Sequence, residues 1–277
     1  MLWKRDKLFC EMNPLFYLIS EKKEQLKRFA KDAASSDRIA KTKRSEPLPC
    51  LVANHRSVLI KKGKGIDPAL QEGKAVNIEL ASAELNGLVI HPGEVFSFWK
   101  TVGNTTKRKG YQLGRIIEGD SLKPSRGGGL CNLAHTISLL VLHSPLDVVE
   151  LHLHSDALAP DQGERVPFAT GTSINYNNLD YRFKNNTDQD VQLLLWCEGG
   201  CSHGELRSVE EFPWSYSLVE EDHHFEKEGD KYFSVSRVYR NTLDKATGAV
   251  VKKELIVQNH SEVMYDHAAI PQELVRG

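Results

Sequence analysis

Residues 125–132 read SRGGGLCN, and the apolar segment 133–143 follows at once. Apolar side chains recur in this segment at the spacing of one helix face, at Leu133, Ile137, Leu140 and Val141. Three consecutive glycines open backbone angles that are closed to other residues, and they leave no side chain on the approach. We therefore predict a tight glycine turn that leads into a central helix over residues 131–143.

The patterns differ on the two sides of this turn. Upstream, apolar residues at helical spacing predict an amphipathic helix over residues 14–34 and a short helix over 75–84. Downstream, strands are predicted at 148–154, 173–178, 179–185, 191–197 and 204–210, followed by a hairpin of 231–242 and 249–259. Separate runs of helices and strands indicate an α+β fold. We expect a mixed or antiparallel sheet core with the central helix after the GGGxC turn, an N-terminal helix and a C-terminal β-hairpin.

Charge and composition suggest three regions. The chain of 277 residues holds 36 Lys and Arg against 37 Asp and Glu, yet residues 1–65 hold 16 against 7. Residues 35–50 are rich in Ser, Lys and Pro, as linkers are. We predict a basic N-terminal helix and linker over 1–50, a core domain over 51–210 and a C-terminal hairpin extension over 211–277.

The basic N-terminal helix can act in two ways. Its apolar stripe, which includes Leu18, Ile19, Leu26 and Phe29, can pack onto the acidic body. Alternatively, the helix makes a weak contact with an anionic surface such as lipid headgroups. We expect packing, since leaving four large apolar side chains in water forgoes roughly 1.5–3 kcal/mol each.

Several function classes are disfavoured by composition. No run reaches the roughly 18 apolar residues of a membrane span, and the first 20 residues are broken by charges and Pro14, unlike a secretory signal. This predicts a cytoplasmic protein, with membrane-peripheral attachment as the alternative. No aromatic residues interleave with the basic ones, so we expect no nucleic-acid partner. No nucleotide-binding or HExxH motif occurs either.

Cys131 is the candidate nucleophile. It follows the glycines near a helix N-terminus, where unpaired N–H groups favour a thiolate and can receive an oxyanion. This predicts an exposed thiol with a lowered pKa. A thiol nucleophile also needs a base, for which His152 and His154 are candidates because they alternate along one predicted strand and share a side. Asp156 and Asp180 are the nearest carboxylates that could orient a histidine. The structural alternative is that Cys131 is a small buried helix residue.

Other residues of metal-ligand type carry weaker signals. Cys197, Cys201 and His203 could hold an ion together with Cys10 or Cys50, or the two hairpin cysteines could form a disulfide. One pair with three residues between is a poor match to structural zinc, so we expect inert thiols, no metal and no cofactor. His223 and His224 lie in an acidic run that reads as a solvated loop.

Beyond these residues, the sequence resembles the VanW family, named for an accessory protein of vancomycin B-type resistance gene clusters. The resemblance runs from about Gly93 to Arg207. It is carried by four motifs in order: PGEVFSFWKTVGNTTKRKGY, the GGGLC turn, VVELHLHS and SINYNNLDYRFKNNTDQDVQLLLW. The segment TGAVVKKELIVQNHSEVMY near the end also resembles the tail of short family members.

The resemblance implies a connection with the cell wall, because some multidomain proteins with such domains act as cysteine-dependent L,D-transpeptidases. Cys131 matches the family cysteine, His152 and His154 match its HxHS element, and Asp180 matches the Asp before the RFKN strand. The family usually has Gln after the cysteine, whereas this chain has Asn132. Asn donates the same amide hydrogen bond from a side chain one methylene shorter.

Together these observations predict acyl transfer to and from Cys131, with His154 preferred as base and a peptidoglycan stem peptide or precursor as partner. The substrate-binding residues would be Arg126, Gly127, Gly128, Gly129 and Asn132. The alternative is a non-catalytic module that binds a peptidoglycan precursor through the glycine turn. A third interpretation is a cytoplasmic regulator that keeps the fold without the chemistry.

Overall fold

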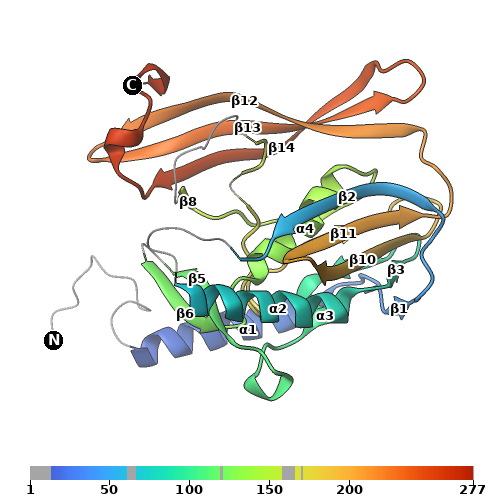
Figure 1. Ribbon diagram of the computed structural model, residues 1–277, viewed down its shortest axis with the longest axis horizontal. Helices are drawn as coiled ribbons and strands as arrows, with labels where there is room; N and C mark the ends of the chain where they lie inside the picture. Colours follow the sequence, from blue (N-terminus) through green and yellow to red (C-terminus); the bar gives the residue numbers. More distant parts are fainter. Residues whose placement is uncertain (1–13, 61–66, 119–120, 158–165, 170, 277) are drawn as a thin grey trace.

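The computed structural model describes residues 14–60, 67–118, 121–157, 166–169 and 171–276 (Figure 1). It confirms the α+β class: helices and several antiparallel sheets, with a helix at the N-terminal end and strands at the C-terminal end. The α-helices of the described part are α1 (Pro14–Ala34), α2 (Pro68–Leu85), α3 (Phe98–Val102) and α4 (Leu130–Leu142).

The central sheet has the order β1-β3-β10-β11-β2, and every neighbouring pair is antiparallel. Its strands are β1 (Thr42–Lys43), β3 (Leu88–Ile90), β10 (Val191–Glu198), β11 (Cys201–Ser208) and β2 (Cys50–Val58). Helix α2 packs on β10, and α4 packs on β2 and β11. The main core forms between these layers, where Leu133 and Ile137 of α4 are fully buried with Leu195 and Leu206 of the sheet.

Two smaller units complete the surroundings of α4. One is a three-stranded sheet of β4 (Val95–Ser97), β9 (Arg182–Lys184) and β7 (Asp147–Glu150). The other is a hairpin of β5 (Leu113–Glu118) and β6 (Ser121–Arg126). Because β6 leads directly into the glycines before α4, this hairpin fixes the point at which the helix begins.

A second large sheet lies above the rest of the molecule in Figure 1, in the order β15-β12-β13-β14-β8. Its strands are β15 (Val275–Arg276), β12 (Trp214–Glu228), β13 (Lys231–Asp244), β14 (Val250–Val263) and β8 (Asp156–Ala157). The predicted hairpin is therefore part of a larger sheet. The prediction of a solvated loop at His223 and His224 is wrong, since both lie in β12 and His224 is buried.

Several predicted elements differ in extent. Helix α2 is longer than the predicted 75–84 because Asp67 caps it and Pro68 starts it, with the Asp67 carboxylate accepting from the Ala69 amide. The strand predicted at 148–154 ends at Glu150, after a bulge in its pairing with β9. The predicted strand at 173–178 is absent from the described structure, where only isolated bridges occur. The predicted linker contains β1 and the buried Leu48.

The N-terminal helix packs in the opposite orientation to the expected one. Arg28 is buried, and its guanidinium donates to Glu150 at 2.6 and 2.9 Å and to Asp180 at 3.3 Å. Leu26 and Phe29 of the predicted packing stripe are 69% and 62% exposed. The stripe prediction is wrong at these residues and at Ile19, while the side chain of Leu18 lies outside the described set. The buried ion pairs of Arg28 therefore connect α1 to the body of the protein.

Candidate functional site

The glycine turn is held by contacts that leave no room for side chains. Gly127 and Gly129 have φ of +75° and +95°, which only glycine adopts without strain. Gly128 lies directly against the backbone of Gly114 in β5, so a Cβ at either position would overlap the other residue. The buried Asn77 of α2 donates from Nδ2 to the Gly128 carbonyl at 3.0 Å. The turn is thus clamped between β5 and α2.

Cys131 lies in the first turn of α4 and lines a groove of about 530 Å³. Its wall is formed by α1, the loop after α3, the β5–β6 hairpin, the glycine turn and residues 174–176. Gly127, Gly129 and Arg126, three of the residues proposed above for substrate binding, line it. Gly128 and Asn132 are not among the described residues of the wall.

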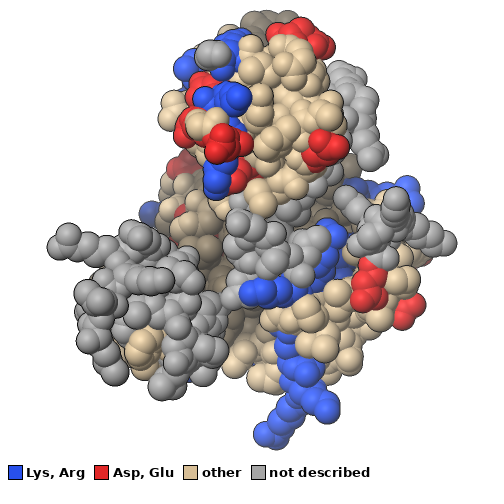
Figure 2. All heavy atoms as spheres, turned by 90° about the vertical axis from the view of Figure 1, so that its left-hand side faces the viewer, with Lys and Arg blue, Asp and Glu red and all other residues tan. Residues whose placement is uncertain are grey.

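The groove is basic. Lys22 of α1, Lys123 and Arg126 line it, and the described lining residues include no Asp or Glu. Trp99 and Tyr176 add aromatic surface, and their rings meet edge to face with centroids 5.5 Å apart. Figure 2 views the molecule from the left-hand side of Figure 1, on which α1 begins; Lys and Arg side chains occur there both on the C-terminal sheet, beside Asp and Glu, and below it. Such a lining favours a ligand that carries carboxylate or phosphate groups.

The Cys131 thiol is protonated in the free protein at neutral pH. Burial raises its pKa above the ordinary value, although its hydrogen bond to the Ile174 carbonyl, at 3.7 Å, opposes the shift. The expected lowered pKa is therefore wrong: the desolvation of the thiolate outweighs the helix N-terminus. Any nucleophilic role then needs a group that takes the proton.

The two predicted histidines have different surroundings. His152 contacts Glu150 with its ring, Nε2 to Oε1 at 3.0 Å, so Glu150 rather than Asp180 orients it. Both histidines lie beyond the end of β7, so strand alternation does not place them on one side. His154 instead interacts electrostatically with His135 of α4.

Asp180 and Glu150 belong to a buried ion cluster that also contains Arg28, Asp32, Lys100 and Arg182. Asp180 accepts from Ser97 Oγ at 2.5 Å and from Arg182 Nε at 2.8 Å. Burial opposes ionisation of Glu150, but hydrogen bonds from His152 and Arg28 hold its pKa well below the ordinary value. Three carboxylates face three cations, so the cluster is balanced. Asp180 thus joins α1, α3 and β9 through Arg28, the Trp99 amide and Arg182.

His135 is the imidazole that the sequence analysis missed. It follows Cys131 by four residues on α4, the spacing that puts Cβ atoms about 5–6 Å apart on one helix face. Its ring lies 5.2 Å from that of Phe168, and its buried Nδ1 has no hydrogen-bond partner within the described part of the chain. Burial, together with the charges of His55 and His154, lowers its pKa to about 4. At neutral pH the ring is therefore uncharged, and it is a weaker base than an exposed histidine.

The shifted pKa of His135 predicts acid sensitivity. Between pH 6.5 and about 4 the unfolded chain binds a proton that the folded protein rejects, so stability falls as pH falls through this window. The loss should reach about 1 kcal/mol per pH unit. Urea unfolding of the wild type and of His135→Gln at several pH values measures it. The two proteins should differ in slope below pH 6.5; parallel curves would contradict the burial of this ring.

Asn132, next to the cysteine, points away from the groove. Its amide Nδ2 donates to Ser57 Oγ of β2 at 3.2 Å, and the same hydroxyl is 3.4 Å from Oδ1. The side chain that stands at the family's Gln position thus ties α4 to the central sheet. Backbone N–H groups of the turn, and not this amide, are therefore the candidates for oxyanion stabilisation.

The hairpin cysteines do not form a site in the structure. Cys197 pairs with Ser202 and Glu198 with Cys201 across β10 and β11. Because neighbouring residues of a strand point to opposite faces, Cys197 and Cys201 lie on different sides of the sheet. All four described cysteines are free, and His203 stacks on Trp196. Cys10 lies outside the described residues.

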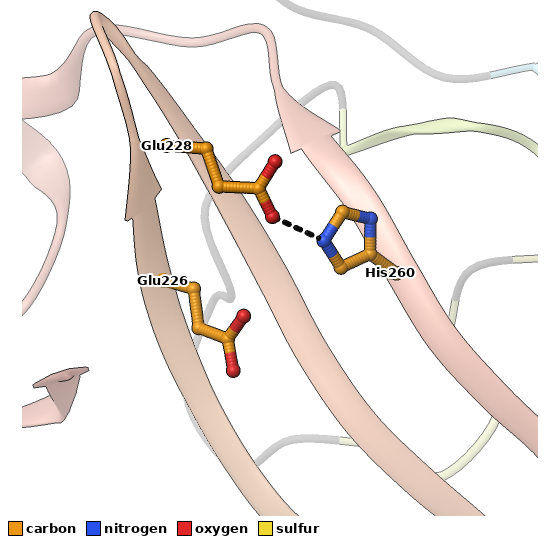
Figure 3. A group of neighbouring side chains, drawn as sticks. All are labelled: Glu226, Glu228 and His260. Carbon is orange, nitrogen blue, oxygen red and sulfur yellow. Dashed lines mark hydrogen bonds and ion pairs between the residues drawn. The ribbon is translucent and has the colours of Figure 1, made fainter. Parts of the chain in front are cut away.

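A cluster of metal-ligand type occurs on the C-terminal sheet, where Glu226 and Glu228 of β12 face His260 of β14 (Figure 3). Glu228 and His260 are exposed, whereas Glu226 is partly buried. Glu228 pairs with His260 at 3.0 Å, and Glu226 pairs with His224 at 2.9 Å. Each carboxylate thus has an imidazole partner: Glu226 pairs within β12, and Glu228 reaches across β13 to His260 of β14.

Comparison with known proteins identifies a family domain that contains most of the residues lining the groove. Residues 73–207 match the family model described as "VanW like protein". The vancomycin B-type resistance protein VanW of Enterococcus faecalis is 25% identical over 226 residues, which are 82% of each chain. The protein YoaR of Bacillus subtilis is 28% identical over 129 residues, 47% of this chain and 41% of that relative. No solved structure matches significantly. No helix among the described residues has the length and apolarity that crossing a bilayer requires.

Proposed function

We propose that the basic groove of this chain binds a peptidoglycan stem peptide or precursor, and that Cys131 accepts an acyl group from this ligand. The premise is that the chain belongs to the VanW family through the domain at residues 73–207. The family's association with vancomycin resistance supports a role connected with the cell wall. The observation that carries the finer proposal is the place of Cys131, at the start of α4 and in the wall of the groove.

The proposed step moves one proton and one acyl group. The Cys131 thiol gives its proton to an imidazole, and its sulfur attacks the carbonyl carbon of an amide in the stem peptide. A thioester forms as the C–N bond breaks, and the imidazole returns the proton to the leaving amine. An acceptor amine or water then attacks the thioester and restores the thiol. N–H groups of the turn stabilise the oxyanion.

His135 is the proposed proton acceptor, because it lies one helical turn from Cys131 and is neutral at pH 7. His154 is the second candidate, since it is electrostatically coupled to His135. His152 serves the ion cluster through Glu150 and is expected to contribute only through packing.

Binding without chemistry is the second candidate function, and the raised pKa of Cys131 favours it. In that case the groove grips an anionic peptide, and the thiol serves only as a small buried residue that contacts the Ile174 carbonyl. The two candidates differ in whether a covalent adduct forms.

Mass spectrometry of the intact protein after incubation with a synthetic stem peptide distinguishes them. Acyl transfer predicts an adduct on the wild type and on Cys50→Ala, and none on Cys131→Ala. The variant whose histidine is the base, His135→Gln or His154→Gln, should form it at least about 100-fold more slowly. Peptide affinity that is the same in the wild type and Cys131→Ala, with no adduct on either, would instead establish the binding module.

A further inference from the structure

The solvent-facing side of α1 is apolar. Ile19, Leu26 and Phe29 are 48%, 69% and 62% exposed, and Ala30 and Ala33 are exposed beside them. At 100° per residue, Ile19, Leu26 and Ala30 lie on one stripe of the helix. We call these five residues the α1 apolar face. A surface helix of a globular protein usually presents its polar face to water, whereas α1 presents this apolar face.

The orientation of α1 is fixed by its polar side. Arg28 and Asp32 are buried in the ion cluster, where Arg28 contacts Glu150 and Asp32 contacts Lys100 at 2.9 Å and Arg182 at 2.7 Å. Rotation of the helix to bury the apolar face would take both charged side chains out of this cluster. The α1 apolar face is therefore held outward by the body of the protein.

Lysines flank this face. Lys22, Lys23, Lys27 and Lys31 are all exposed. Lys22 contacts Gln25, and Lys27 contacts Glu24 at 2.6 Å. An apolar stripe bordered by lysines complements a surface that is negatively charged outside and apolar below, which is the interface of an anionic bilayer. We propose that α1 docks flat on anionic phospholipid through the α1 apolar face and these lysines.

Docking would also set the position of the groove. Lys22 and Gln25 of α1 line it together with Cys131. A helix that lies in the headgroup layer would therefore place the groove mouth beside the membrane surface, within reach of substrates attached to lipid. The docking itself is independent of the chemistry proposed for Cys131, so its test needs no activity.

Co-sedimentation of the full chain with vesicles tests the proposal. The protein should bind vesicles of phosphatidylglycerol and phosphatidylcholine, bind pure phosphatidylcholine weakly, and lose binding as salt rises. Leu26→Gln combined with Phe29→Gln should lower partitioning at least about tenfold. The matched control is Val250→Gln with Val251→Gln, two apolar residues of β14 that are each 54% exposed. This control should bind like the wild type.

Thermal melting checks that both double variants fold. Both should melt like the wild type, since all four substituted side chains are exposed. Equal vesicle binding by the α1 variant and the wild type would overturn the proposal, as would no binding to phosphatidylglycerol at low salt. A concentration-dependent dimer in sedimentation velocity that the α1 variant abolishes would overturn it too, because a second copy of the chain would then cover this face.

Discussion

Replacing Arg28 with Met is expected to destabilise the protein by about 3 kcal/mol or more. The Arg28 side chain is 7% exposed and contacts three carboxylates, those of Asp32, Glu150 and Asp180. Without it, Lys100 and Arg182 face those three negative charges alone. Removing one partner of a buried ion cluster leaves an uncompensated charge in a medium that solvates it poorly. Urea unfolding at pH 7 measures the loss.

The neighbouring Lys27 supplies the matched control. Its side chain is 59% exposed and pairs with Glu24 three residues earlier, so Lys27→Met should change stability by less than about 0.5 kcal/mol. If the two variants unfolded at the same urea concentration, the buried anchor of α1 would be refuted. Arg28→Met should also loosen the groove wall, because α1 contributes Lys22 and Gln25 to it.

The orientation of α1 shows what local pattern can and cannot predict. The spacing of Ile19, Leu26 and Phe29 correctly indicates an amphipathic helix. Which face turns inward depends on Arg28, whose partners Glu150 and Asp180 are 122 and 152 residues away in sequence. Periodicity assigns the apolar face to the core by default, and a buried ion cluster built from distant segments reverses that assignment.

In the candidate site, too, local sequence predicts some features, while others depend on segments that are distant in sequence. The glycine turn and α4 follow from local sequence, since three glycines before an apolar helical pattern leave few alternatives. The pKa of Cys131 does not, because it depends on the Ile174 segment that covers the thiol. His135 was within reach of sequence reasoning, as a Cys and a His four residues apart in a predicted helix share a face. Its neutral state depends on His55 and His154, which only the fold brings near.

Strand β12 is absent from the prediction for a related reason. The run from Glu220 to Asp230 is acidic and contains two adjacent histidines, a composition typical of a loop. In the structure its residues up to Glu228 belong to β12, where Glu226 and Glu228 each have an imidazole partner. Pairing with a neighbouring strand decides whether such polar residues can form a strand, and this pairing is not visible locally.

Gly128→Ala should destabilise the protein by about 3 kcal/mol or more and disturb the groove. The backbone at Gly128 is not left-handed, so the cost comes from contact: a methyl group there would overlap the carbonyl of Gly114 in β5. The atoms that this methyl group would meet belong to the Gly114 backbone, so they cannot rotate away as a side chain could. Relief requires β5 and the turn to move apart, and a shift of the turn would also disturb the hydrogen bond from Asn77 of α2 to the Gly128 carbonyl, which measures 3.0 Å.

Gly199→Ala is the control for this substitution. Gly199 has φ of +57° but has open space around its Cα, so alanine there should cost only the left-handed strain of about 1 kcal/mol. Thermal and urea unfolding give both costs, and the alkylation rate of Cys131 reports on the turn because the thiol lies three residues beyond Gly128. Gly128→Ala should expose the thiol and speed its alkylation, whereas Gly199→Ala should leave the rate unchanged.

A Gly128→Ala protein as stable as Gly199→Ala, with an unaltered alkylation rate, would show that β5 does not clamp the turn. The clamp is what holds the start of α4, and Cys131 with it, in the wall of the groove.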